Sequence, residues 1–266
     1  MTHDTFRELV YSYYQPDGRG MPWRADTQPY YIVVSELMLQ QTQVSRVIPK
    51  FQEFIARFPD FHALAEADFR DVLVLWSGLG YSRRARFLHQ IAQRVVAKFD
   101  GELPRDRALL EALPGIGPGT SGAIMAYAFN APEAYIETNI RSIYIHHFFP
   151  SQDHVDDKQI LKVIESTLDT TQPRIWYWAL MDYGAHLKKT IKNPSRKSKH
   201  YKKQSRFEGS ARQLRSRILQ RIVDIPMTEQ DLMQDFNDDR VAGLLSDLVR
   251  DNMVKKKTDD TYTIAS

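Results

Sequence analysis

The 266 residues include 42% hydrophobic and 26% charged side chains, which is ordinary for a globular chain. The length suffices for two or three compact units, and no apolar run reaches the roughly eighteen residues of a membrane span. The sequence contains no cysteine, which excludes disulfides, thiolate–zinc sites and cysteine-ligated clusters. Because the first residues also lack a signal-peptide pattern, we expect a cytoplasmic protein with no metal or cofactor.

Helical periodicity dominates as far as about residue 187. Met21–Arg24 is expected to be an extended approach to the second helix. The predicted helices cover residues 6–14, 29–43, 45–57, 60–65, 68–75, 82–99, 106–112, 120–129, 139–148, 156–168 and 173–186. Asp60, Asp68 and Asp106 stand where N-cap residues belong. The pattern predicts an all-α fold with two lobes, one from residues 1–28 with 133–187 and one from residues 29–132.

Positive charge is concentrated in one segment of the chain. Residues 188–221 hold thirteen Lys or Arg and one acid, a net +12, which leaves −9 for the rest of a chain whose total is +3. A flexible solvated linker would explain exposure but not this one-sidedness. The segment therefore predicts contact with an anionic partner, and nucleic acid fits best.

The C-terminal part differs from the rest in its pattern. Residues 188–209 have no apolar period and are expected to form a basic loop or linker. In residues 210–266, predicted helices at 210–224, 228–236 and 238–252 precede two short segments that could pair as a hairpin. This order predicts a small winged-helix-like unit. Its third helix carries many acids and would read a major groove poorly, so Lys255–Lys257 of the wing are better phosphate ligands.

A carboxylate interrupts an apolar helical run at residues 33–39, V-V-S-E-L-M-L. Glu36 could be an exposed acid on an amphipathic helix, but its neighbours on both sides are apolar. Burial disfavours the ionised form and raises a carboxyl pKa, which a general acid at neutral pH requires. Glu36 is therefore the candidate proton donor.

The segment L-P-G-I-G-P-G-T, residues 113–120, lies between two helical patterns. Its glycines permit a tight turn that directs the N–H groups of the following helix at an anion. Such a helical hairpin can bind a DNA phosphate without reading sequence, although glycine-rich helix connections are common. The candidate phosphate ligands are Leu113, Gly115, Gly117, Gly119 and Thr120.

A second acid, Glu137, begins the segment that leads into the helix at about residue 139. It could simply favour the helix dipole. A carboxylate there could also stabilise positive charge that develops on a deoxyribose ring. Cleavage of an N-glycosidic bond needs both functions, protonation of the departing base and stabilisation of an oxocarbenium-like sugar.

Four motifs together carry a resemblance to a known family: V-S-E-L-M-L-Q-Q-T-Q-V, L-W-S-G-L-G-Y-S-R-R-A-R, L-P-G-I-G-P-G-T and A-L-M-D-Y-G-A. Over residues 5 to about 187 the sequence resembles the helix-hairpin-helix DNA glycosylases, and most of all the adenine DNA glycosylases. The resemblance implies that Glu36 protonates the base and that Gln41 and Tyr81 enter the duplex where the base flips out. It also implies that Trp23 and Arg24 lie near the base pocket.

The sequence departs from that family in several places. The family's catalytic Asp is replaced by Glu137, and Gly119 stands where the endonuclease III relatives carry a Schiff-base lysine. Trp178 stands in the base pocket where adenine-specific members tend to have a polar side chain. The cluster cysteines are missing, and residues 210–266 are too short for the Nudix-like domain that reads 8-oxoguanine. The basic segment is expected to contact phosphates instead of a cluster loop, through Lys197, Lys199, Lys202 and Lys203.

The sequence thus predicts a monofunctional DNA glycosylase of base excision repair that removes a flipped, mispaired base, adenine first. Its partner would be double-stranded DNA with a mismatch or lesion, bound by a monomer close to the nucleoid. Two alternatives remain. The protein could excise another mispaired or damaged base, such as thymine, uracil or a deaminated purine, or it could be a catalytically idle binder of distorted DNA.

Overall fold

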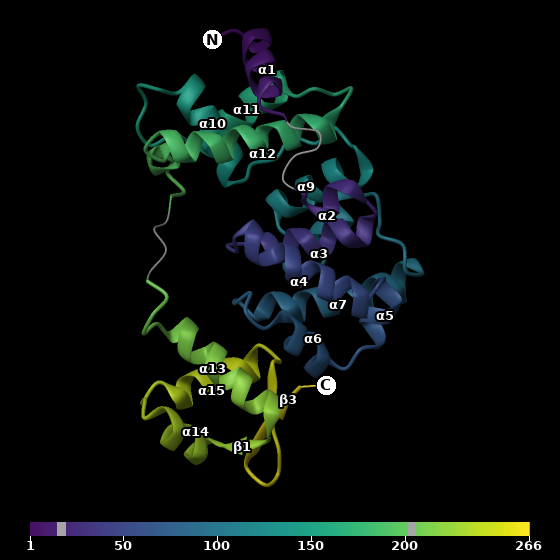
Figure 1. The fold of residues 1–266 in the computed structure, drawn as a ribbon, viewed down its shortest axis with the longest axis vertical. Helices are drawn as coiled ribbons and strands as arrows, with labels where there is room; N and C mark the ends of the chain where they lie inside the picture. The colour runs from purple at the N-terminus through teal and green to yellow at the C-terminus, as the bar shows by residue number, and fades with distance from the viewer. Residues whose placement is uncertain (15–19, 202–205, 266) are drawn as a thin grey trace. The chain divides into compact units, whose positions relative to one another are not determined.

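A computed structural model describes residues 1–14, 20–201 and 206–265. The contacts within the chain group into two compact units (Figure 1). The first consists of Met1–Glu36 and Pro104–Lys203, and the second of Leu37–Leu103 and Gln204–Ser266. No helix in the described ranges has both the length and the apolarity needed to cross a membrane.

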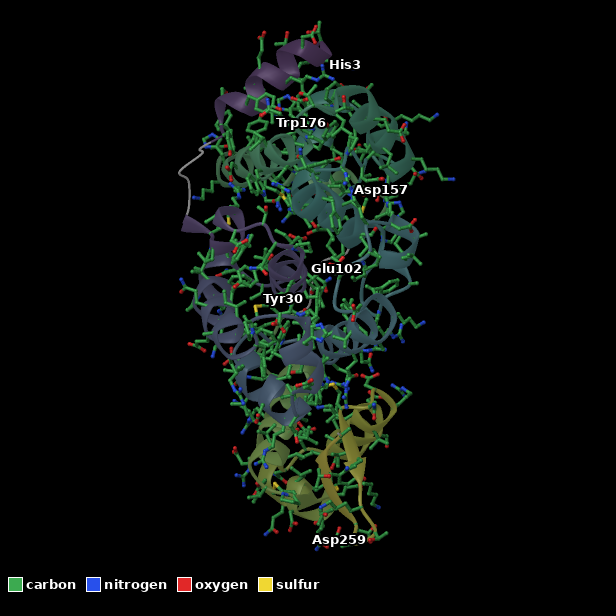
Figure 2. The ribbon with its side chains drawn as sticks, turned by 90° about the vertical axis from the view of Figure 1, so that its right-hand side faces the viewer. His3, Tyr30, Glu102, Asp157, Trp176 and Asp259 are labelled. Carbon is green, nitrogen blue, oxygen red and sulfur yellow. The ribbon has the colours of Figure 1, made fainter. Side chains whose placement is uncertain are left out.

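The regular elements described in the first unit are helices, apart from an isolated parallel bridge between Val155 and Ser198. It holds α1 His3–Ser12, α2 Pro22–Ala25, most of α3 Pro29–Leu39, α8 Arg107–Glu111, α9 Pro118–Phe129, α10 Thr138–Phe148, α11 Asp157–Thr167, α12 Pro173–Thr190 and the 3-10 turn η2 Pro194–Lys197. Helix α12 packs against α1, α9 and α10. The buried Trp176 of α12 meets the ring of Phe6 edge-on at 6.0 Å, and Figure 2 shows it close to α1.

Four helices of the second unit precede its C-terminal part: α4 Val44–Arg57, α5 Phe61–Glu66, α6 Phe69–Trp76 and α7 Arg83–Phe99. Helix α7 packs against α5 and α6, and its apolar stripe is buried there. Pro49 lies inside α4, within the first half of that helix. Residues 40–43 lie between α3 and α4, and residues 78–82 lie between α6 and α7. These two loops carry the candidate site residues Gln41 and Tyr81.

The C-terminal part of the second unit is winged-helix-like, as predicted. Its elements follow the order α13 Ala211–Asp224, β1 Met227–Thr228, α14 Glu229–Phe236, α15 Val241–Arg250, β2 Val254–Lys256 and β3 Thr261–Ile264. The antiparallel sheet has the order β1-β3-β2, so the predicted hairpin is present and Val254 pairs with Ile264. Strand β1 was not predicted, because two residues are too few to show an alternating pattern.

The observed helix ends agree with the predicted ones to within a few residues, and three predicted caps are confirmed. The side chains of Asp60, Asp68 and Asp106 accept backbone N–H groups of α5, α6 and α8. The prediction for residues 21–24 was wrong: Pro22 begins α2, because its fixed φ suits the first turn of a helix. Helix α3 ends at Leu39, earlier than predicted, and the chain turns at Gln41 with a φ of +58°.

The two observed units differ from the two expected lobes. Residues 29–36 and 104–132 were expected in the second lobe, but they belong to the first unit. Helix α9 packs on α12, and the missing Cβ at Gly122 makes room for the Tyr135 side chain, whose Cβ would otherwise lie 2.3 Å away. The basic segment also differs from a plain loop. Its first residues extend α12 to Thr190, and the turn η2 packs on α10.

Candidate active site

Glu36 lies on α3 among buried side chains. Val33, Val34 and Ser35 have lost almost all contact with solvent, whereas Glu36 itself keeps a partly exposed side chain. The low-dielectric surroundings penalise its ionised form, and the nearby negative charge of Glu137 adds to this. Together these effects raise the pKa of Glu36 to about 8, burial being the larger cause. At neutral pH the carboxyl group is therefore mostly protonated, and it can donate a proton.

Glu137 is the N-cap residue of α10. Its Oε1 accepts the N–H of Ile140 at 2.7 Å, and its Oε2 accepts from the Asn139 side chain at 3.3 Å. Burial raises the pKa of Glu137, while the backbone hydrogen bond from Ile140 and the positive charge of Lys188 work in the opposite direction. The residue thus has the helix-start position of the simpler interpretation, and its charge also acts on Glu36.

A buried tyrosine connects the two acids. Burial raises the pKa of Tyr127 on α9, and the charges of both Glu36 and Glu137 raise it further, which places the phenol near both carboxyl groups. The Tyr135 hydroxyl donates to the Tyr127 hydroxyl at 3.0 Å. Tyr127 was not predicted as a site residue, because an aromatic residue inside an apolar helix is normally a core residue.

Trp178 forms an aromatic wall beside this tyrosine. Its ring stacks on Tyr127 with centroids 6.3 Å apart and planes inclined by 20°. The guanidinium of Arg24 lies over the Trp178 ring, 5.3 Å from its centroid, and makes a bidentate ion pair with Asp182. Trp23, on α2, is buried. The structure thus brings Arg24 and Trp178 together, and Asp182, which lies in the A-L-M-D-Y-G-A motif, is their unpredicted partner.

The glycine hairpin precedes α9 as expected. Gly115 has a φ of +76°, Gly117 is the N-cap residue and Pro118 occupies the first turn. A Cβ on Gly119 would lie 3.0 Å from the Ile136 carbonyl oxygen, so α9 approaches the segment before Glu137 closely. The first turn of an α-helix has N–H groups without intrahelical acceptors, which suits an anion. Leu113 and Thr120 flank this turn on either side.

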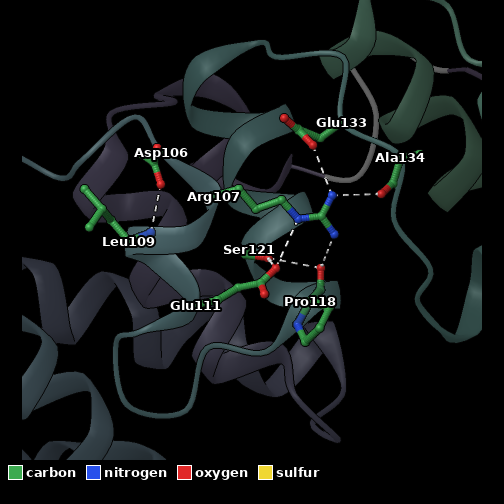
Figure 3. A network of polar contacts seen from close by, with 8 residues as sticks. All are labelled: Asp106, Arg107, Leu109, Glu111, Pro118, Ser121, Glu133 and Ala134. Atoms are coloured by element: carbon green, nitrogen blue, oxygen red, sulfur yellow. Dashed lines mark hydrogen bonds and ion pairs between the residues drawn. The ribbon is translucent and has the colours of Figure 1, made fainter.

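An arginine network fixes the hairpin (Figure 3). Arg107 of α8 donates to the Pro118 carbonyl at 3.2 Å, to the Ala134 carbonyl at 3.1 Å and to the Glu133 carboxylate at 3.0 Å. The network joins both helices of the hairpin to the segment that leads to the second acid. It therefore couples the position of the glycine turn to that of Glu137.

In the second unit, Gln41 and Tyr81 lie in two turns that we call the wedge turns, residues 40–43 and 78–82. Both have a left-handed backbone, with φ of +58° and +48°, which is costly for residues with a side chain. Buried Arg84 holds the turns together: its guanidinium donates to five carbonyls, among them those of Gln40 and Gly80 at 2.6 and 3.0 Å. The remaining acceptors are the carbonyls of residues 37, 38 and 79 and the Thr42 hydroxyl. Arg84 was missed because the motif offers several arginines and only the fold buries one.

The basic segment is anchored to the first unit by side-chain hydrogen bonds. Asn193 caps η2 by accepting the Ser195 N–H, and the Ser195 hydroxyl lies 2.6 Å from that of Ser142 on α10. Lys197 donates to the Pro150 carbonyl at 2.6 Å, and Lys199 lies 3.6 Å from Asp156. Lys202 and Lys203 lie outside the described residues.

An iron–sulfur cluster does not fit this chain. Its 266 residues supply no thiolate, and the described residues hold no group of three or more His, Cys, Asp or Glu arranged for a metal. The hydroxyl pair of Ser142 and Ser195 occupies the contact between α10 and the segment after α12. That segment is held by this hydroxyl pair and by backbone hydrogen bonds that join Val155 to Lys197 and Lys199.

Residues 34–168 match the HhH-GPD superfamily base excision DNA repair protein family, a range that begins just before Glu36 and includes the hairpin and Glu137. The chain belongs to this family. The predicted membership in the helix-hairpin-helix superfamily is thereby confirmed. The family range stops before Trp178, the basic segment and the winged-helix-like part.

Several curated relatives are adenine DNA glycosylases. One from Buchnera aphidicola is 36% identical over 70% of this chain and 53% of its own length. One from Mycolicibacterium smegmatis is 38% identical over 65% of this chain and 60% of its own length, and the human one is 33% identical over 72% and 36%. The chain thus spans between about a third and three fifths of the length of these relatives.

Solved structures agree on the fold. A thermostable thymine-DNA glycosylase superposes with a TM-score of 0.62 at 24% identity, covering 69% of this chain and 86% of the other. A trapped endonuclease III–DNA covalent intermediate gives 0.60 at 18% identity, covering 70% and 87%. At such identities the likeness establishes the mostly helical fold alone.

Proposed function

We propose that this protein is a monofunctional DNA glycosylase that hydrolyses the N-glycosidic bond of a flipped, mispaired base. The observation that supports this most strongly is the pairing of two carboxyl groups in unequal environments. The pKa of Glu36 is raised to about 8, partly by the charge of Glu137. Hydrogen bonds from Ile140 and Asn139 instead favour the ionised form of Glu137. Burial raises the pKa of Glu137 as well, but these hydrogen bonds and the charge of Lys188 oppose that rise. Glu36 is therefore the better proton donor and Glu137 the better anion of the pair, which is the division that glycosidic cleavage needs.

The two acids would act in sequence. Glu36 gives its proton to a ring nitrogen of the departing base, the bond from that base to C1′ breaks, and its electron pair leaves with the base. The deoxyribose ring becomes oxocarbenium-like, and the Glu137 carboxylate stabilises its positive charge. Water then adds to C1′ and passes its proton to the acid pair. Both acids return to their starting protonation after one turnover.

DNA contact would come from two features that do not read sequence. The hairpin from Leu113 to Thr120 would bind one phosphate at the first turn of α9, and Gln41 and Tyr81 would enter the duplex beside the flipped base. The left-handed backbone at both wedge residues supports this, since strain of this kind is concentrated at functional sites. The protein is proposed to act on DNA as a monomer.

Adenine is the first candidate for the excised base, because curated relatives at 36% and 38% identity are adenine DNA glycosylases. A specific observation favours a second candidate. Trp178 stacks on Tyr127 in the base pocket, so an aromatic wall stands where adenine-specific members tend to offer polar groups. An aromatic ring stacks on any base, whereas a polar side chain selects one base by hydrogen bonding. The enzyme could thus accept thymine, uracil or a deaminated purine.

The test is a panel of duplexes, each with one mismatched or damaged base, incubated with excess protein and analysed by mass spectrometry for the released base. We expect release from the adenine mismatches, and Glu36→Gln should lower that rate by about 10²–10⁴-fold without changing duplex affinity. Glu53→Gln, on the exposed face of α4, is the matched control. If the parent protein and the Glu53→Gln control release no base from any duplex of the panel, the protein is a binder of distorted DNA and not a glycosylase.

Glu137 can be tested for geometry as well as for charge. Glu137→Gln should slow excision strongly, because an amide does not stabilise a positive sugar. Glu137→Asp should also be slower than the parent, since a shorter side chain that caps Ile140 no longer reaches the same point. Equal rates for all three proteins would leave Glu137 only its role as the cap of α10.

A further inference from the structure

A groove of about 830 Å³ lies in the second unit, between the wedge turns and helix α13 of the winged-helix-like part. One wall carries Tyr81 and Arg83, and the floor is formed by the turns that Arg84 holds. The opposite wall comes from Phe207 and the arginines of α13. The site proposed above for base excision uses none of the α13 residues.

The groove is strongly positive. Its lining includes six arginines and one acid, Asp251. That acid is already neutralised, because Arg215 lies 2.7 Å and Arg83 lies 3.6 Å from its carboxylate oxygens. Arg46 and Arg217, on α4 and α13, have exposed side chains. The excess charge therefore faces solvent and would attract phosphate groups.

Aromatic rings stand among these guanidinium groups. Arg212 of α13 lies over the Tyr81 ring at 5.3 Å from its centroid, and it donates to the Tyr81 hydroxyl. Phe207 is 53% exposed, although a large apolar ring normally avoids water. Rings beside guanidinium planes bind nucleobases by stacking, while the cations bind the backbone. The combination fits a nucleotide better than it fits an acidic peptide, which would not use the rings.

Hydrogen bonds fix the winged-helix-like part, and with it the α13 side of the groove, to helices α6 and α7. Buried Arg86 of α7 donates to the carbonyls of Asn252 and Ala265, the second at 3.2 Å. Arg70 donates to the Asp224 carbonyl at 3.1 Å, and Gln220 donates to Ser77 at 3.2 Å. These bonds run from α6, the following turn and α7 to both ends of the winged-helix-like part, so the groove keeps its shape.

We propose that this groove is a DNA-strand site, in which Arg46 and Arg217 bind phosphates and the exposed ring of Phe207 accepts a base next to the wedge turns. The winged-helix-like part would thus contact DNA through its first helix, α13, and not through the third, α15, whose surface carries acids such as Asp247. This inference rests on the proposed function, since it extends the DNA surface of the same enzyme.

The first test is the salt dependence of binding to a duplex of about 25 base pairs with one adenine–guanine mismatch, measured by fluorescence anisotropy. The variant Arg46→Ala/Arg217→Ala loses two phosphate ligands, so the slope of log affinity against log salt should be shallower by about 1.8 units. Between 50 and 200 mM salt its affinity should then fall about 12-fold less than that of the parent. Arg57→Ala/Arg250→Ala removes the same charge from α4 and α15, outside the groove, and should keep the parental slope.

The second test locates the strand. A duplex carrying 5-iododeoxyuridine near the mismatch, irradiated with the protein, should cross-link to Phe207, as identified by mass spectrometry of the peptides; a cross-link to Tyr81 alone would report only its entry into the duplex and would overturn the groove assignment. Cross-links confined to α15 or to the β2–β3 wing would overturn the proposal. So would a parental salt slope in the groove variant, once circular dichroism has shown that the variant is folded.

Three further outcomes separate this inference from others. If the groove variant loses affinity for dAMP but not for the duplex, the groove is a site for a free nucleotide and the proposal is wrong. The groove variant could have a shallower salt slope than the parent while the parent releases no base. In that case the proposed enzymatic function fails and the DNA-strand site stands. If it releases base while the groove variant binds as the parent does, only the groove assignment fails.

Discussion

Arg24 and Asp182 form a bidentate ion pair, with Nη1 and Nη2 lying 2.9 and 3.0 Å from the two carboxylate oxygens. Their side chains are 12% and 7% exposed, so both charges are largely desolvated. The pair ties α2 to α12 and holds the guanidinium over Trp178. It thus joins a short N-terminal helix to the aromatic wall of the proposed base pocket.

Breaking this pair should be costly, because the remaining guanidinium would stay buried without its counter-charge. We expect Asp182→Asn to lower the free energy of unfolding by about 3 kcal/mol. Asp235→Asn, which breaks the more exposed pair with Arg221, should cost no more than about 1 kcal/mol. Urea unfolding of both variants measures the difference, and similar losses would show that the buried pair has no special weight.

Glu36 should reduce stability at neutral and alkaline pH. Its pKa is raised from 4.5 to about 8 in the folded protein, so the folded state holds the proton more tightly than the unfolded chain does. Stability then falls as pH rises from about 4.5 to about 8. Glu36→Gln removes this penalty, so the variant should have a larger free energy of unfolding than the parent at pH 8. Each kcal/mol gained should raise Tm by about 2–4 °C. At pH 4 the two proteins should melt together; a difference in Tm that does not change with pH would contradict the raised pKa.

Arg84 should control the wedge turns. Burial lowers the pKa of this guanidinium to about 10, and the planar group donates six hydrogen bonds, five to carbonyls and one to the Thr42 hydroxyl.

 The Arg84 guanidinium also lies over the Trp76 ring, 5.4 Å from its centroid. Lysine cannot reach the same set of carbonyls.

We therefore expect Arg84→Lys to destabilise the protein by roughly 2–4 kcal/mol, because buried carbonyls lose charged donors. It should also reduce the preference for mismatched over matched duplex, since Gln41 and Tyr81 lose their fixed backbone. Arg83→Lys, whose side chain is exposed, is the control. A variant with parental Tm and parental duplex preference would show that the turns do not depend on Arg84.

Gly119 should tolerate a side chain poorly. A Cβ there would lie 3.0 Å from the Ile136 carbonyl oxygen, so α9 would have to shift relative to the segment before Glu137. We expect Gly119→Ala to cost about 1–3 kcal/mol and to slow base release. Gly243→Ala on α15, where nothing lies within 4 Å of an added Cβ, should instead leave or raise stability.

The same glycine bears on strand cleavage. With no amine at residue 119, the parent should form no borohydride-trapped covalent complex with DNA. A trapped complex with the unmodified protein would overturn the monofunctional assignment. Gly119→Lys should gain such a complex only if the backbone shift still directs the new amine at the sugar.

The basic segment should contribute to DNA affinity through charge alone. Replacing Lys197, Lys199, Lys202 and Lys203 with Ala should make the salt slope shallower by up to roughly 4 units and weaken binding to all sequences alike. The partners of Lys197 and Lys199 are surface groups, and such exposed contacts exchange readily with phosphates. An unchanged salt slope would show that the segment is only a charged linker. A change smaller than 4 units would show, at about 0.9 units per contact, how many of the four lysines contact phosphates.

The sequence by itself determined most of the helices, because an apolar period of 3.6 residues and the caps at Asp60, Asp68 and Asp106 are local signals. It also indicated the glycine hairpin, the terminal β-hairpin and the two acids. Each of these is marked by residues close together in the chain. The short strand β1 and the helical turn at Pro22 escaped because their segments are too brief to show a period.

Only the tertiary structure decided which side chains the acids meet. The raised pKa of Glu36 depends on Glu137, a hundred residues away in the chain, and on burial that no local pattern measures. The same holds for Tyr127 on Trp178 and for Arg212 on Tyr81, whose partners come from distant helices. Burial, charge coupling and stacking depend on distance in space, and folding sets that distance through packing of the whole core rather than through any one segment.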